Sequence, residues 1–416
     1  MLKGVIKNSK NLNRKCLKIK IKQVLTTKKR GTLLRALTAP WLRALLLAPR
    51  AKGAYRKVMA DWKERAEIDG DVVFFNYEEI SSYSELKEVF IWDLDKTYLD
   101  TSIDSLSGLF QTIMERAFAK KNIPGTNILI QRLSRFQREL KQESYSPIVF
   151  ITASPPQMEE KIYEKFQIDG LRPMGCFYKD NLRNLVPKRF WRLRKQIGYK
   201  IQALMQLRLL LPANIRQICW GDDSESDAII YNLYSDICSR RMGVHDIRST
   251  LEKLLVPGEQ IDHILEMQMQ IPENDPVEKI YINLATDTDP DYYLKFGRRT
   301  LATYNTFQVA LDLLQDQRLA LEDILHISQE MIFNYKFTPE ELMSSFDELI
   351  RRNVLGISVF EMAKHYFVEK GLMPSDFKTS VEPVREKRVE NGIVYELEGV
   401  HEPWVQDHID YLHDYR

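Results

Sequence analysis

The stretch Phe90-Ile91-Trp92-Asp93-Leu94-Asp95-Lys96-Thr97 joins an apolar run to the pattern Asp-x-Asp-x-Thr. The run Val89–Trp92 predicts a buried strand, so that Asp93 and Asp95 follow at its carboxyl end. Two carboxylates two residues apart are costly to hold there unless a cation neutralises them. A Mg²⁺ ion would do so and would leave one oxygen of Asp93 to attack a phosphorus atom. Asp, Lys and Thr are also common in turns, so the segment by itself is equally compatible with a surface turn.

Two more apolar runs, Ile148–Ile151 and Ile215–Trp220, are also rich in β-branched and aromatic residues and bounded by polar ones. Such runs are typical of parallel strands that are buried on both faces. Segments with helical periodicity lie around them, at Leu109–Lys120, Ile128–Leu140, Gln157–Phe166 and Phe190–Leu210. The alternation predicts an α/β domain with a doubly wound parallel sheet over residues 85–245.

The parts of the chain on either side differ from this domain. Residues 1–60 form a basic N-terminal arm, with 17 Lys and Arg residues and no acidic residue before Asp61. Such an arm predicts contact with phosphates of lipid head groups or of nucleic acid. Residues 250–416 are predicted to form a mostly α-helical accessory region. Its clearest helix start is Thr338-Pro339-Glu340-Glu341, where Thr338 and Glu341 can form a capping box.

The composition is that of a soluble globular protein, with 416 residues, 44% hydrophobic and 28% charged. The four cysteines form no Cys-x-x-Cys pair, which favours a reduced, cytoplasmic setting and no zinc site. The most apolar segment, Leu33–Pro49, is interrupted by Arg35, Pro40 and Arg43, so no membrane span is predicted. It is interpreted as part of a flexible arm with a short buried helix, and the alternative is an amphipathic segment peripheral at a membrane surface.

Polar side chains with compatible chemistry follow each of the three predicted strands. Asp93 and Asp95 follow the first, Thr152 follows the second, and Asp222 follows the third. In open parallel sheets, functional groups gather beyond the carboxyl ends of the strands. Lys200 begins a helical run between the second and third strands and can offset the charge that develops on phosphoryl oxygens. Carboxylate oxygens in this number suit Mg²⁺.

These four segments, in this order, resemble the haloacid dehalogenase superfamily of phosphatases. The motifs of that superfamily are Asp-x-Asp-x-Thr, then Thr or Ser, then Lys, then Gly-Asp with further acids. The resemblance implies a haloacid dehalogenase-like Rossmannoid fold. The intervals 98–147 and 156–199 are largely used by helices and a strand of the core, so only a minimal cap and an open site are expected.

A narrower resemblance is to the phosphatidate phosphatase catalytic domain of the fungal actin-patch protein and its bacterial relatives. The segment Ile151-Thr152-Ala153-Ser154-Pro155 is similar to the Val-Ser-Asn-Ser-Pro of that family. Lys200 is followed by Pro212 at the spacing of the family, and the stretch 221–231 is similar to its Gly-Asp-Ser-Gly-x-x-Asp-Pro-x-Ile-Tyr element. The similarity covers about residues 85–235. The chain departs from the family pattern at Thr152, Ala153, Pro156, Tyr199, Asp223 and Ala228.

The resemblance implies a role for each matching residue. Asp93 would be the nucleophile that forms an aspartyl-phosphate, and Asp95 the general acid and then the base. Thr152 would bind a phosphoryl oxygen and Lys200 would balance charge, while Thr97 would fix the loop. The metal ligands would be Asp93, Asp95 through its backbone carbonyl, and Asp222. Asp227 would assist the metal or orient Lys200, and these alternatives stay open, as does a role for Asp223.

The expected function is a Mg²⁺-dependent phosphatase for phosphate monoesters, with phosphatidate at a membrane surface as the leading substrate. The basic and aromatic run 188–195 suits a membrane interface, and equally a solvated helix face. One alternative is a phosphatase for another macromolecule, a protein or a nucleic-acid end, with the arm as a tether. Another is a non-catalytic helical scaffold with a vestigial phosphatase domain.

Overall fold

The structure is a computed structural model, and it describes most of the chain beyond residue 61. The described residues are 62–77, 86–100, 121–141, 146–180, 191–224, 226–285, 287–382, 386–390, 393–397 and 405–413. The basic arm, the predicted helix Leu109–Lys120 and the segment Leu33–Pro49 lie outside them. The side chains of the run 188–195 are likewise outside the description.

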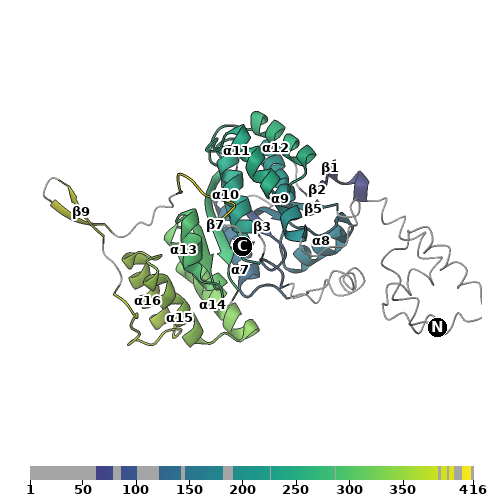
Figure 1. Cartoon of the computed structure of the whole chain (residues 1–416). Coiled ribbons are helices and arrows are strands. Elements are labelled where there is room, and N and C mark those ends of the chain that lie inside the picture. The colour runs from purple at the N-terminus through teal and green to yellow at the C-terminus, as the bar shows by residue number, and fades with distance from the viewer. Residues whose placement is uncertain are drawn as a thin grey trace, which may run out of the picture. The chain divides into compact units, whose positions relative to one another are not determined.

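An eight-stranded, mostly parallel sheet forms the centre of the described structure (Figure 1). Its order is β1-β2-β5-β4-β3-β6-β7-β8, and all neighbours are parallel except β1 with β2 and β2 with β5. The strands are β1 (Glu67–Asp69), β2 (Val72–Asn76), β3 (Glu88–Asp93), β4 (Ser146–Ile151), β5 (Pro173–Lys179), β6 (Arg216–Asp222), β7 (Val277–Asn283) and β8 (Thr300–Thr303). The α/β class is therefore confirmed, and the predicted strands are found as β3, β4 and β6.

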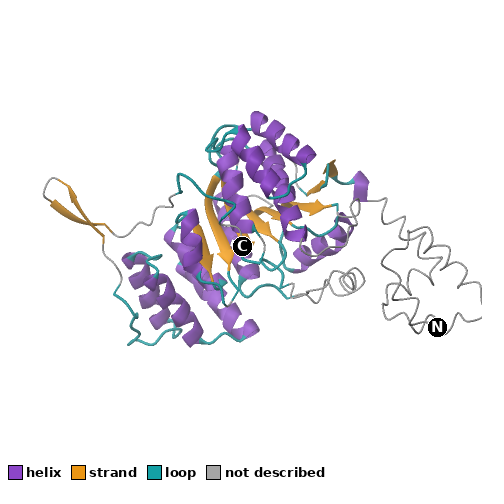
Figure 2. Ribbon diagram, viewed as in Figure 1, coloured by secondary structure: helices purple, strands orange, loops and turns teal. Residues whose placement is uncertain are grey.

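Helices cover both faces of this sheet (Figure 2). One face packs against α9 (Trp191–Leu210), α10 (Asp227–Cys238), α11 (Val244–Lys253) and α12 (Gly258–Gln270). The other face packs against α7 (Thr126–Lys141), α8 (Glu159–Ile168) and α13 (Thr306–Gln315), and α14 (Leu321–Tyr335) packs on α7 and α13. The predicted helices Ile128–Leu140, Gln157–Phe166 and Phe190–Leu210 correspond to α7, α8 and α9.

The two faces of β3 explain why its sequence is apolar throughout. Val89 and Ile91 belong to the core beneath α9–α12, whereas Phe90 and Trp92 point to the opposite face. There Trp92 stacks on Trp220 of β6 at a centroid distance of 4.5 Å, and Trp220 stacks in turn on Tyr281 of β7 at 5.1 Å. Each aromatic pair adds about 1 kcal/mol beyond the burial of its area. The stack fixes the register of three adjacent strands.

The region after residue 250 is helical over most of its described length, but it also supplies two strands of the sheet, which the sequence analysis did not expect. β7 extends β6 in parallel, and β8 extends β7. The β7 sequence carries Glu278 and Lys279, and β8 is only four residues long, so neither resembles the apolar runs of the other strands. Lys279 is buried only because Asp312 and Asp316 neutralise it, and this partnership is not visible in the local sequence.

Two further α-helices and a hairpin follow the sheet in the described part of the chain. α15 (Pro339–Arg351) and α16 (Ile357–Glu369) follow α14, and β9 (Glu386–Glu390) pairs with β10 (Ile393–Leu397). The predicted capping box of α15 is confirmed: the Thr338 hydroxyl accepts from the Glu341 N–H, and the Glu341 carboxylate accepts from the Thr338 N–H. Among the described helices, none combines the length and the apolar character that crossing a bilayer requires.

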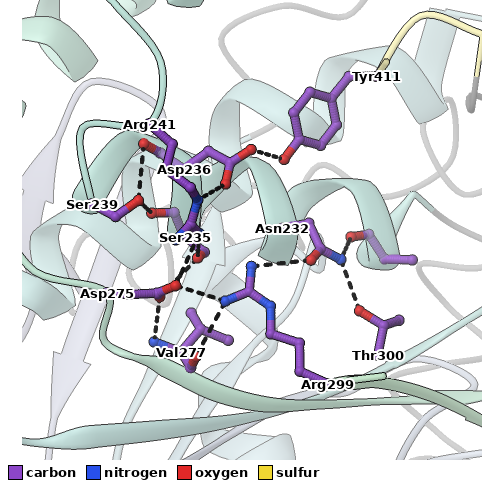
Figure 3. Close-up of polar contacts among 11 residues, drawn as sticks. Asn232, Ser235, Asp236, Ser239, Arg241, Asp275, Val277, Arg299, Thr300 and Tyr411 are labelled. Carbon is purple, nitrogen blue, oxygen red and sulfur yellow. Dashed lines mark hydrogen bonds and ion pairs between the residues drawn. The ribbon is translucent and has the colours of Figure 1, made fainter. Parts of the chain in front are cut away.

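The segment 405–413 returns to the core and contacts the end of α10 (Figure 3). Ile409 and Tyr411 are both buried, and the Tyr411 hydroxyl donates to the Asp236 carboxylate. Asp236 also pairs with Arg241 at 2.6 Å. In the same polar network, Arg299 pairs with Asp275 at 2.8 Å. These contacts fix the end of α10 that lies away from its first residue, Asp227.

Candidate active site

The predicted site residues gather where three adjacent strands end. In the order β4-β3-β6, the carboxyl ends of the strands carry Thr152, Asp93 and Asp222 side by side. From β3 the chain continues first to β4 on one side and later to β6 on the other. This reversal of strand order makes the edge a topological switch point, which is the usual position of ligand sites in open α/β sheets.

A buried lysine joins two of the carboxylates. Lys200, in α9, places its Nζ 2.8 Å from Asp93 Oδ1 and 2.5 Å from Asp227 Oδ1. All three side chains are at most 2% exposed. Asp93 faces α9 because it shares the side of β3 that Val89 and Ile91 occupy. The close contact of Asp227 with Lys200 supports the interpretation that Asp227 orients the lysine.

Asp93, Asp222 and Asp227 also form a cluster that can hold a metal ion. One carboxylate oxygen from each of them lies within 4.8 Å of the others, and all three residues are buried. Within this set, three carboxylates and one ammonium leave an excess of two negative charges, which is unfavourable in a buried site. Buried carboxylate oxygens in this arrangement fit the ligand preference of Mg²⁺.

Gly221 makes the approach of Asp227 to β6 possible. A Cβ atom at residue 221 would lie 2.3 Å from the Asp227 Cβ, so a larger residue would push Asp227 away. The Asp222 N–H donates to Asp227 Oδ2 at 3.3 Å. The Asp222 carboxylate itself accepts from the N–H and the hydroxyl of Ser224, at 2.6 and 2.5 Å. This turn therefore aims two acidic side chains into one small volume.

Asp95 and Thr152 meet on the other side of Asp93. The Thr152 hydroxyl donates to Asp95 Oδ2 at 3.0 Å and accepts from the Ser154 N–H at 3.0 Å. The Thr152 hydroxyl thus fixes the Asp95 carboxylate from the end of β4. The expected contact of Asp95 with metal through its backbone carbonyl stays a prediction.

Tyr199 is a site residue that the sequence analysis named only as a departure from the family. Its hydroxyl donates to the Thr152 carbonyl at 2.7 Å, and its side chain is fully buried. Burial raises the pKa of Tyr199 well above its ordinary value, so the phenol stays a donor at any working pH. Its position next to Lys200 was the sequence signal that could have identified it. The two successive residues of α9 contact the ends of two neighbouring strands, β4 and β3.

Two other residues of the motifs, Thr97 and Asp223, have surroundings that the sequence did not show. Thr97 is buried, but its hydroxyl has no hydrogen-bond partner among the residues that the structure describes. The loop is closed instead by backbone bonds, from the Leu99 N–H to the Leu94 carbonyl and from the Lys96 N–H to the Leu99 carbonyl. The Asp223 carboxylate turns away from the acidic cluster and accepts from the Ala285 N–H at 2.9 Å and from the Thr288 hydroxyl.

Residues 89–245 match the family model of the phosphatidate phosphatase APP1 catalytic domain. The resemblance that the motifs predicted is thereby confirmed for this segment, which is less than half of the chain. The APP1-like segment runs from β3 to the start of α11 and contains Asp93, Asp95, Thr152, Lys200, Asp222 and Asp227. β7 and β8, which complete the sheet, lie beyond it. No curated protein and no solved structure matches the chain.

Proposed function

We propose that this protein is a Mg²⁺-dependent phosphatase that hydrolyses phosphate monoesters through an aspartyl-phosphate, with phosphatidate at a membrane surface as its substrate. The main support is the pair of buried contacts from Lys200 to Asp93 and Asp227. Asp93 and the neighbouring Asp222 lie at the ends of adjacent strands. The APP1-like segment supports the choice of phosphatidate. The basic arm supports contact with a membrane from the cytoplasmic side.

We extend the proposal to the fold and to the metal. The parallel order β5-β4-β3-β6-β7, with helices on both faces, supports a doubly wound, haloacid dehalogenase-like core with a minimal cap. Asp93, Asp222, Asp227 and the Asp95 carbonyl would hold Mg²⁺, which when bound supplies positive charge to the site and to the phosphoryl oxygens.

The chemical steps use residues that lie close together. A carboxylate oxygen of Asp93 attacks phosphorus, and the P–O bond to the alcohol breaks as Asp95 gives its proton to the leaving oxygen. Asp95 then takes a proton from a water molecule, whose oxygen attacks the phosphorus of the aspartyl-phosphate. This second step releases phosphate and restores Asp93. Thr152 and Lys200 would bind the phosphoryl oxygens throughout.

A phosphate-release assay on the full chain tests the proposal. We expect Mg²⁺-dependent release from phosphatidate in mixed micelles, and loss of that release when a chelator is added. Asp93→Asn should abolish it with the fold intact, whereas Asp262→Asn, on the exposed surface of α12, should not change it. Release only from water-soluble monoesters would count against the lipid substrate. No release from lipid, sugar, nucleotide or phosphopeptide substrates with Mg²⁺ present would favour a scaffold instead.

A further inference from the structure

The loop that carries Asp95 contains a residue in an unfavourable backbone conformation. Lys96, between Asp95 and Thr97, has φ of 62°, in the left-handed region that side chains with a Cβ seldom adopt. Such a conformation persists only where its surroundings hold it. One holding contact is local, from the Lys96 N–H to the Leu99 carbonyl at 2.8 Å.

The second contact comes from a distant part of the chain. The side-chain amide of Asn283 donates to the Lys96 carbonyl at 3.3 Å. Asn283 is the last residue of β7 and pairs in register with Asp222 of β6. It therefore reaches the loop after β3 across the end of the strand that carries the acidic cluster. It also lies 38 residues beyond the APP1-like segment, in the region predicted to be helical.

Asp223 fixes the backbone around Asn283. The Asp223 N–H donates to the Asn283 carbonyl at 3.1 Å. Its carboxylate accepts from the Ala285 N–H and the Thr288 hydroxyl, so the turn that follows β7 is tied to the turn that follows β6. This arrangement gives a role to an acid that the sequence analysis left unassigned. Asp223 anchors the turn after β7 rather than a metal ion.

We propose that Asn283 is a positioning residue that holds the Asp95–Thr97 loop in its active conformation, with Asp223 as its support. The inference rests on the proposed function, in which Asp95 must reach the leaving oxygen. The end of β7 would thus be part of the active site, although it lies outside the segment that the family match covers.

The test combines hydrogen exchange with kinetics on full-length Asn283→Ala and Asn274→Ala. Asn274 is the matched control, because it also donates to a backbone carbonyl, that of Ala213, but lies in the turn before the first residue of β7. In Asn283→Ala we expect amides of the peptide 94–99 to exchange about tenfold faster. We expect kcat/KM for an alkyl phosphate such as glycerol phosphate to fall about tenfold more than kcat/KM for p-nitrophenyl phosphate, because kcat/KM reports the formation of the aspartyl-phosphate, in which Asp95 acts as the acid. p-Nitrophenolate leaves without a proton, so this first step is insensitive to a misplaced Asp95, whereas the later attack of water needs Asp95 equally for both esters.

Each outcome has a defined meaning. Unchanged exchange in Asn283→Ala, or the same acceleration in Asn274→Ala, overturns the inference. Faster exchange with equal losses on both esters shows a structural role only and also overturns it. If the wild-type protein hydrolyses neither ester, the proposed function fails, and the exchange comparison alone decides whether Asn283 holds the loop.

Discussion

Replacing Asp222 by Asn should stabilise the metal-free protein, although it removes a residue of the proposed site. Asp222 shares the buried cluster with Asp93 and Asp227, at separations of up to 4.8 Å. At an effective dielectric constant of about 20, two charges at this distance repel by about 3.5 kcal/mol, so Asp222 takes part in about 7 kcal/mol of repulsion. A proton taken up by the cluster relieves part of this energy. We therefore expect the free energy of unfolding of Asp222→Asn to exceed that of wild type by about 2 kcal/mol in a chelator.

In Mg²⁺ the wild-type protein should instead be more stable than Asp222→Asn. A ligand at 100 times its Kd stabilises the folded state by about 2.7 kcal/mol, and only the complete cluster should gain this amount. Urea unfolding can be followed through the fluorescence of the buried Trp92 and Trp220, with a chelator and with Mg²⁺. The asparagine can keep the bonds from Ser224, so the turn itself should survive.

Asp236→Asn is the matched control for this experiment, because Asp236 lies on the same helix as Asp227 but pairs with Arg241. Breaking that pair should destabilise the protein by about 3 kcal/mol and leave the gain from Mg²⁺ unchanged. The reasoning is refuted if Asp222→Asn is less stable than wild type in chelator. It is also refuted if Mg²⁺ stabilises both proteins equally.

Three further predictions concern the surroundings of the site. Tyr199→Phe should cost about 2 kcal/mol of stability and lower kcat about tenfold. Tyr234→Phe removes an equally buried hydrogen bond, to the Gln217 side chain, and should lower stability without changing kcat. Urea unfolding measures the first effect and steady-state kinetics the second. Burial and the nearby Asp169 raise the pKa of Glu330 to about 7, so between about pH 4.5 and pH 7 this carboxyl is more protonated in the native protein than in the unfolded chain. Stability should therefore fall as the pH rises through 7, and Glu330→Gln should remove about 1 kcal/mol of that fall in urea titrations at pH 5 and pH 8. A chain ending at residue 245 would leave β6 as an uncovered edge and should aggregate, and a soluble monomer with cooperative unfolding would contradict this.

The strands at the centre of the sheet were predictable because they are buried on both faces and must be apolar throughout. Strands of this kind are usually parallel, and parallel strands bring their carboxyl ends together. This predicted that Asp93, Thr152 and Asp222 lie at one edge of the sheet. The expectation that Lys200 begins a helix was wrong, because Lys200 lies in the middle of α9 and contacts Asp93 from there. For these residues the order of motifs along the chain was enough.

The strands β7 and β8 were not predictable because their polar residues are explained only by partners elsewhere. From the sequence alone Lys279 would be expected at the surface. Its burial is explained by Asp312, which α13 places beside it. Tyr199 and Asn283 act on backbone carbonyls, which carry no sequence signature. The sequence identified the groups proposed to react, and the structure was needed for the groups that hold them.

The docking of residues 409–411 against α10 also bears on how the protein is made. A chain emerging from the ribosome presents the sheet and its helices first, whereas Tyr411 is made 175 residues after Asp236. Until then the apolar surface that Ile409 and Tyr411 cover is open to solvent, and Asp236 lacks one of its partners. The nascent chain therefore cannot complete this part of its core until these residues have been made. Until then it depends on whatever keeps exposed apolar surface from binding to other chains.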